Sequence, residues 1–131
     1  MSLFAAKARA ARSDGAAGAV LPILQRLLVV VDAENRQLSE RRRVDYQAHS
    51  QKKNQGLWEL MRVRAALENA RANAEVSAAL SDLCEKLEIN RRLLKAQLRA
   101  AQTVAGIVAR AIREGQSDGT YSAYPWRDEA I

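Results

Sequence analysis

The feature that most limits the fold of this chain is a long run of helical spacing toward its C-terminal end. No glycine or proline occurs between Gly56 and Gly106, so no local breaker interrupts a helix there. Apolar side chains recur at three- and four-residue steps, the spacing of one helix face. This seam predicts a helix of about ten turns, or roughly 55 Å, that Gly115 ends. Its residues are Val76, Leu80, Leu83, Leu87, Asn90, Leu94, Leu98, Ala101, Ala105, Val108 and Ile112.

An earlier segment has the same spacing. Apolar side chains recur at helical steps between Val20 and Leu38, and Pro22 falls in the first turn, where a helix tolerates proline. Before this segment lies an Ala- and Arg-rich stretch, residues 1–18. We expect that stretch to be a flexible, disordered N-terminal arm, since chain ends are poorly ordered unless another element holds them.

Residues 39–56 form a polar stretch that fits two accounts. They are either the exposed part of one long helix, or a break followed by a second helix that begins near Asp45. We favour a turn at residues 43–46, because a basic run suits the end of one helix and Asp suits the N-cap of the next. Further on, the apolar stripe slips by two residues, which predicts a turn at residues 69–73. The second helix is expected to carry on or beside its inward face Tyr46, His49, Lys53, Leu57, Leu60, Met61 and Leu67.

These segments together predict an all-α protein. We expect one domain, because 131 residues fall within the usual size of a single domain. The predicted architecture is a three-helix, antiparallel, coiled-coil-like hairpin bundle that spans residues 19–114. The glycine-containing segment 115–131 is expected to be a flexible C-terminal tail.

The sequence offers little for catalysis. His49 is the only histidine and Cys84 the only cysteine, so the chain can form neither an internal disulfide nor a metal site of several cysteines. We expect His49 to be a solvated or half-buried structural side chain and Cys84 a small core residue. No glycine-rich phosphate loop is present either, so we expect no enzymatic activity, no cofactor and no metal. The single thiol favours a cytoplasmic location, and the short apolar runs near the N-terminus predict no stable membrane insertion.

Asn90 interrupts the otherwise apolar seam. A polar group inside such a seam usually costs stability while it fixes the register or the partner of the helix. The alternative is that Asn90 lies at the edge of the stripe, in contact with water. The sequence favours neither account over the other.

The formal charge of +6 raises the odds of an anionic partner. Residues 90–113 hold six cationic and no acidic side chains, enough for a salt-dependent contact with phosphates. We take these cations to surround the helix, and no aromatic side chains lie among them to stack on bases. A solvated face is therefore favoured and nucleic acid is not the expected partner. A basic coiled-coil protein that binds nucleic acid or builds an assembly stays as the alternative function.

A third use of a basic helical hairpin is to bind the amphipathic segment of a partner along its seam. Glu34 lies four residues before a leucine, Asp45 opens the expected second helix, and Lys53 lies four residues before another leucine. Later, Asn90 precedes a pair of leucines, and "GTYSAYPW" follows the last helix. In this order, over roughly residues 20–124, the chain resembles the FlgN-type flagellar export chaperones.

The resemblance implies a function. Members of that family are cytoplasmic chaperones that hold the helical terminal segment of hook-associated proteins and deliver them to the flagellar type III export gate. It also implies that Tyr121 docks at the export gate, although this tail lacks the glycine that usually follows the tyrosine of the family. A second copy of the chain could also cover a long seam, so the oligomeric state stays open. The implied client-binding residues are Leu83, Leu87, Asn90, Leu94, Leu98 and Ala101.

Overall fold

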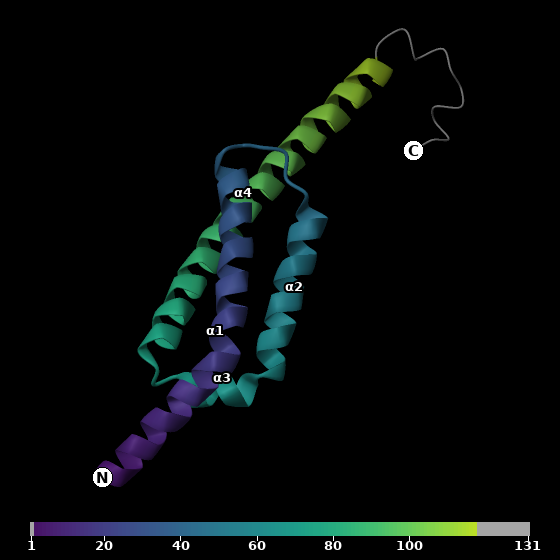
Figure 1. Ribbon diagram of the computed structural model, residues 1–131. Coiled ribbons are helices and arrows are strands. Elements are labelled where there is room, and N and C mark those ends of the chain that lie inside the picture. Colours follow the sequence, from purple (N-terminus) through teal and green to yellow (C-terminus); the bar gives the residue numbers. More distant parts are fainter. Residues whose placement is uncertain (1, 118–131) are drawn as a thin grey trace. The chain divides into compact units, whose positions relative to one another are not determined.

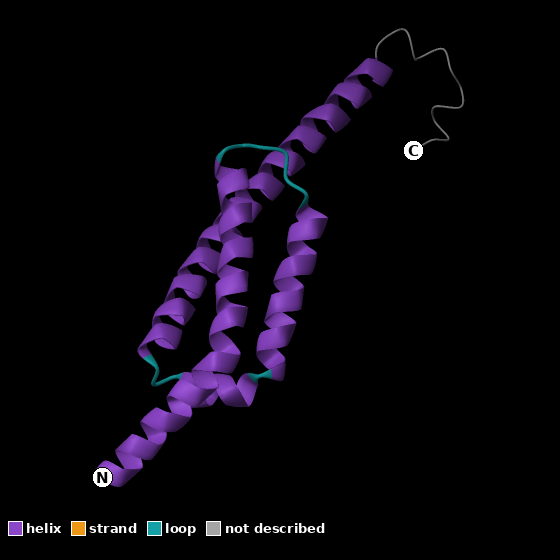
Figure 2. Ribbon diagram, viewed as in Figure 1, coloured by secondary structure: helices purple, strands orange, loops and turns teal. Residues whose placement is uncertain are grey.

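The computed structural model describes residues 2–117, and over that range it consists of α-helices joined by short loops (Figures 1 and 2). The all-α prediction is confirmed, with no strand among the described residues. The chain divides into two units, residues 1–93 and residues 94 onward. The helices are α1 (Leu3–Ser39), α2 (Tyr46–Arg62), α3 (Arg64–Ala70) and α4 (Ala74–Ser117).

Helix α1 begins far earlier than the sequence predicted. The expectation of a disordered arm at residues 1–18 is wrong for residues 3–18, which are helical from Leu3. The Ser2 hydroxyl caps the helix by accepting a hydrogen bond from the Ala5 amide at 3.2 Å. This stretch is rich in alanine, the strongest helix former. Its two glycines each weaken the helix by about 1 kcal/mol relative to alanine, but they do not break it. Ser13 and Ala17 are already buried.

A loop at residues 40–45 separates α1 from α2 and decides between the two accounts of the polar stretch. Helix α1 ends in a Schellman arrangement: the Arg41 amide donates to the Leu38 carbonyl and the Arg42 amide to the Gln37 carbonyl. Arg41 has the positive φ of 55° that this ending requires. Asp45 is the N-cap of α2 and accepts a hydrogen bond from the Ala48 amide at 3.1 Å, as predicted.

The second predicted helix is two helices in the structure. It breaks at Val63, which is both the C-cap of α2 and the N-cap of α3. The predicted turn at residues 69–73 is confirmed, because α3 ends at Ala70 and the Asn73 side chain accepts a hydrogen bond from the Val76 amide at 3.1 Å. The expected inward face was partly wrong: Leu60 is buried, but Tyr46, Leu57 and Met61 are exposed.

Helix α1 supplies most of the core of the first unit. It lies between α2 and residues 74–93 of α4, with the short α3 crossing near the far end of α2 (Figure 1). Because α1 has neighbours on two sides, it buries ten residues, whereas Leu60 is the one buried residue of α2. The core residues are Ala17, Val20, Ile23, Leu24, Leu27, Val31, Leu60, Ala70, Val76 and Leu83.

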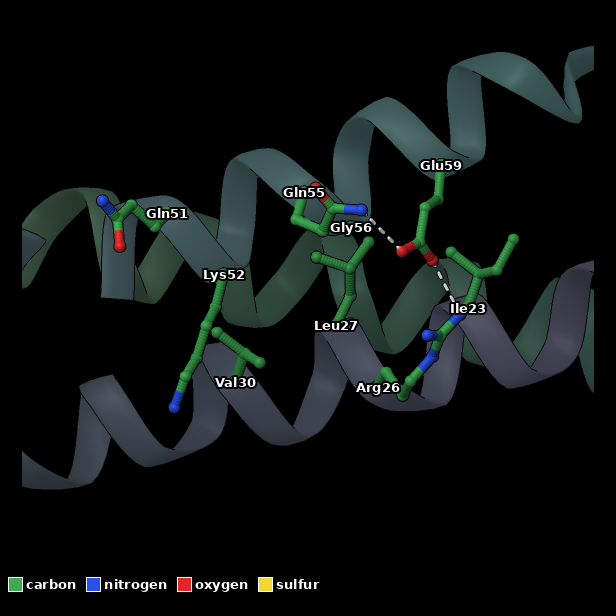
Figure 3. Close-up of a pocket in the computed structure, with 9 residues that line it drawn as sticks. All are labelled: Ile23, Arg26, Leu27, Val30, Gln51, Lys52, Gln55, Gly56 and Glu59. Atoms are coloured by element: carbon green, nitrogen blue, oxygen red, sulfur yellow. Dashed lines mark hydrogen bonds and ion pairs between the residues drawn. The ribbon is translucent and has the colours of Figure 1, made fainter. Parts of the chain in front are cut away.

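Gly56 allows α1 and α2 to approach closely. A Cβ atom at this position would overlap the Leu27 side chain, and Leu27 is fully buried. Figure 3 shows Leu27 directed from α1 toward Gly56 on α2. A bulkier residue would therefore force the two helices apart.

We expect Gly56→Ala to lower the free energy of unfolding by up to about 2 kcal/mol, because overpacking costs about 1–3 kcal/mol and better helix propensity returns only about 1 kcal/mol. Urea unfolding followed by circular dichroism measures the change. Gly18→Ala is the matched control, since nothing lies within 4 Å of a Cβ there, and it should stabilise the protein. Equal effects of the two substitutions would contradict the close contact.

Helix α1 is long and apolar enough, by length and composition, to cross a membrane. The unbroken apolar runs near the N-terminus are each too short to span a membrane, but the mean hydropathy over 18 residues of α1 is high because the window also includes the few polar residues between those runs. Core helices of soluble proteins and N-terminal signal sequences have the same properties. Helix α1 therefore does not decide between a soluble and a membrane-bound protein.

Candidate functional site

A cluster of polar side chains lies inside the first unit, where three helices meet. We call Glu34, Asn35, Lys53 and Asn90 the buried polar cluster. The Lys53 ammonium donates to Glu34 Oε1 at 2.7 Å and to Asn90 Oδ1 at 3.0 Å. The Asn90 amide donates to Glu34 Oε1 at 2.6 Å and to Asn35 Oδ1 at 2.9 Å. The side chains of Glu34 in α1, Lys53 in α2 and Asn90 in α4 are thus each hydrogen-bonded to the other two.

The cluster is shielded from water. Glu34 is 1% exposed, Asn90 3% and the Lys53 side chain 14%. Asn35 completes the set by donating to the Lys86 backbone carbonyl at 3.0 Å. A buried carboxylate is tolerated only when it is paired and hydrogen-bonded, and this arrangement provides both. Asn90 therefore lies within the seam and not at its edge.

A second, more exposed ion pair joins α1 to α4 beside the cluster. The Lys86 ammonium lies 2.8 Å from Asp32 Oδ1. The hydrogen bond from Lys86 lowers the pKa of Asp32, and the same contact raises the pKa of Lys86. On the other side, His49 is half-buried, as expected, with its Nε2 2.9 Å from Gln37 Oε1. These contacts tie neighbouring helices together around the cluster.

The cluster is suited to holding helices in register, because its hydrogen bonds join α1, α2 and α4. Its lysine and carboxylate neutralise each other, and Cys84 is exposed, contrary to the expectation of a core cysteine. Among the residues that the structure describes, no group of three or more His, Cys, Asp or Glu side chains could hold a metal ion. We assign the cluster a structural role.

The structure divides the expected client-binding seam in two. Leu83 and Asn90 are buried, and Leu87 is half-buried against the core. In the folded first unit these three side chains do not form an open surface, because α1 packs against this part of α4. The remaining residues, Leu94, Leu98 and Ala101, belong to the second unit.

Apolar side chains beyond that division are exposed. Leu98, Val104, Ile107, Val108 and Ile112 are each between 50% and 58% exposed. At about 100° of rotation per residue, four of them lie within an arc of roughly 120°, and Ile107 extends it on one side. We call these five side chains the C-terminal apolar face. Ala101 lies inside the same arc and is exposed, whereas Leu94 is half-buried.

The cations of α4 occupy one side of the helix. Because α4 is one continuous helix, the six cationic residues between 90 and 113 fall within an arc of about 100°. The expectation that they surround the helix is wrong. Arg91 and Arg92 both pair with Glu88, at 2.8 and 3.2 Å. In the second unit, the cations are Lys95, Arg99, Arg110 and Arg113, which we call the basic edge.

The pairing of Glu88 predicts a dependence of stability on pH. Hydrogen bonding by Arg91, helped by the charge of Arg92, lowers the pKa of Glu88 from 4.5 to about 2. The folded state therefore binds this proton more weakly than the unfolded state does. The stabilisation is complete above about pH 4.5 and is lost as the pH falls toward about 2.

We expect thermal unfolding of Glu88→Gln to be less sensitive to pH below about 4.5 than that of the original protein. The two melting temperatures should differ most near neutral pH and converge toward pH 2. Glu68→Gln, which removes the exposed pairing partner of Arg71, is the control and should leave the pH profile nearly unchanged. A difference between Glu88→Gln and the original protein that stays constant with pH would contradict the assignment.

A groove lies between α1 and α2. It has a volume of about 390 Å³, with Ile23, Leu27 and Val30 as its apolar floor. Figure 3 shows polar side chains of α2 above that floor and the ion pair of Arg26 with Glu59, at 2.7 Å, across one end. The residues that line the groove include no Ser, Thr, Cys or His, and its floor is part of the helix packing. Tyr121, the expected gate-docking residue, lies outside the described residues.

No family model, no curated protein and no solved structure matches this chain.

Proposed function

We propose that this protein is a cytoplasmic flagellar export chaperone, which holds the helical terminal segment of a hook-associated protein and delivers it to the type III export gate. The observation that carries the proposal is the exposure of the C-terminal apolar face. Five aliphatic side chains on one helix are each at least half exposed. An exposed apolar surface of this kind is typical of a protein–protein interaction site. An amphipathic helix of a partner fits such a surface by packing its own apolar stripe against it.

The choice of client rests on the resemblance to FlgN-type chaperones. The polar residues that carry that resemblance include one from each of three separate helices: Glu34, Lys53 and Asn90. These three side chains meet in the buried polar cluster. Their joint position supports the proposal, because a single buried hydrogen-bonded cluster explains why all three polar residues occur in the family pattern.

The parts of the chain take different roles in this proposal. If α2 and α3 are counted as one interrupted helix, the helices of the first unit support the three-helix, antiparallel hairpin bundle that the helical spacing predicts. The bundle serves as a rigid support, since its polar cluster fixes the register of α4 against α1. The client binds at residues 94–117, and Tyr121 in the following tail docks at the export gate.

A binding titration tests the function. The full chain is titrated with the C-terminal helical segments of the host's hook-associated proteins, at low and at high salt. Saturable one-to-one binding that persists at high salt supports the proposal, because buried aliphatic contacts are little affected by screening. Duplex DNA and RNA are titrated in parallel. If they bind at low salt only and the protein segments do not, the chain is a nucleic-acid-binding protein and the proposal fails.

A further inference from the structure

We propose that the C-terminal apolar face binds an acidic amphipathic helix, in which Asp and Glu side chains border one side of the apolar stripe and face the basic edge. This inference rests on the proposed function and adds to it the chemistry of the segment that is recognised. It identifies the partner by two properties together, an aliphatic stripe and a negative flank.

The two sides of the apolar face differ, and this difference carries the inference. Leu94, Leu98, Ala101, Ala105, Val108 and Ile112 follow the alternating three- and four-residue spacing of a helix that pairs with another helix. On one side of this line, the arc continues with Val104 and Ile107. On the other side it is bordered by Lys95, Arg99 and Arg113. A partner helix therefore meets aliphatic side chains on one flank and cations on the other.

The charge of the segment argues against a second copy of this chain as the occupant. Residues 94–117 contain four cationic side chains and one acidic side chain, which gives a formal charge of +3. Two such segments packed along their apolar faces would bring like charges together at both ends of the contact, where Lys95, Arg99, Arg110 and Arg113 lie. Opposite charges at the flanks of a helix pair set the choice of partner. Charge complementarity therefore favours an acidic helix.

The side chains also argue against a membrane or a nucleic acid. Residues 94–117 contain no Trp, Tyr or Phe, whereas helices that lie in a membrane interface usually carry Trp or Phe on their apolar side. Binding of single-stranded nucleic acid uses aromatic side chains for base stacking. Aliphatic side chains with alanines between them, at Ala101 and Ala105, are the surface against which another helix packs closely.

Three synthetic peptides test the inference against the full chain. Each is about 24 residues long, the length of the segment that it would cover, and has the same Leu stripe. They differ only at three positions along one flank, which hold Glu, Gln or Lys. We expect the Glu peptide to bind roughly tenfold more tightly than the Gln peptide at low salt, since three exposed ion pairs contribute a few-fold or less each. The Lys peptide should bind most weakly, and the differences should shrink at high salt.

Matched variants of the chain locate the effect. The triple variant Lys95→Gln, Arg99→Gln, Arg113→Gln should remove the preference for the Glu peptide while it still binds the Gln peptide. The control is Lys7→Gln, Arg9→Gln, Arg12→Gln, which makes the same change in charge at exposed positions of α1 and should keep the preference.

The results of these titrations distinguish a failure of the acidic-helix inference from a failure of the proposed chaperone function. Equal binding of the Glu and Gln peptides overturns the inference but leaves helix binding in place. If none of the peptides binds and the hook-associated segments also do not, the proposed function fails too. Stronger binding to phosphatidylglycerol vesicles than to the Glu peptide overturns the inference in favour of a membrane surface. A dimer in sedimentation equilibrium that the Glu peptide does not dissociate overturns it in favour of a second copy.

Discussion

Lys53→Met is expected to lower the free energy of unfolding by about 3–5 kcal/mol, the usual cost of leaving one member of a buried ion pair without its partner. Glu34 is 1% exposed, so water cannot replace the lost ammonium. Its carboxylate would keep only the hydrogen bond from Asn90, at 2.6 Å. Chemical unfolding in urea, followed by circular dichroism, measures the loss.

Two further variants separate the buried charge from other effects of removing a lysine. The double variant Glu34→Gln, Lys53→Met should recover most of the lost stability, because no charge is then buried and the amide still accepts from Asn90. Lys52→Met changes an exposed neighbour and should shift stability by no more than about 0.5 kcal/mol. If the double variant is as unstable as Lys53→Met alone, the buried charge is not the cause.

Leu98→Glu is expected to weaken binding of the hook-associated segment by at least about 30-fold, the effect of losing a dominant interface residue. Leu98 is exposed near the start of the C-terminal apolar face, so a carboxylate there would be buried without a partner only in the complex. The free protein should keep its helicity and its unfolding midpoint. Titration with the segment and far-UV circular dichroism of the same sample measure both quantities.

The effect of a substitution by Glu in α4 depends on where the substituted side chain lies on the helix. Thr103→Glu places the same carboxylate at an exposed position on the side of the helix away from Leu98 and next to the basic edge. It should weaken binding by no more than about threefold, the usual effect of one exposed charge. Leu83→Glu should unfold the first unit, since Leu83 is 3% exposed within the core. Loss of binding in Thr103→Glu would show that added charge, and not the apolar face, governs the interaction. Loss of helicity in Leu98→Glu would make that residue part of the folded core.

Local features of the fold could be predicted from the sequence. Asp45 caps α2 and Asn73 caps the start of α4 at the expected turns, because capping depends on a few residues next to one another. Two local features were missed. The alanine content of residues 3–18 outweighed the weakening by their glycines, and no Gly or Pro marks the break at Val63. Long-range contacts were not predictable in the same way, as the partners of Asn90 in α1 lie 55 and 56 positions away.

The sequence by itself determined that this chain is helical and where α2 and α4 begin, since helical spacing and caps are properties of neighbouring residues. Only the tertiary structure decided which part of the α4 seam is core and which is surface. Leu83 and Leu98 follow the same spacing, but Leu83 is buried and Leu98 is 58% exposed. The physical reason is that periodicity states which side chains share a face, whereas burial requires another element against that face. Helix α1 covers Leu83 and Asn90, and the same seam continues as an open apolar face from Leu98 onward.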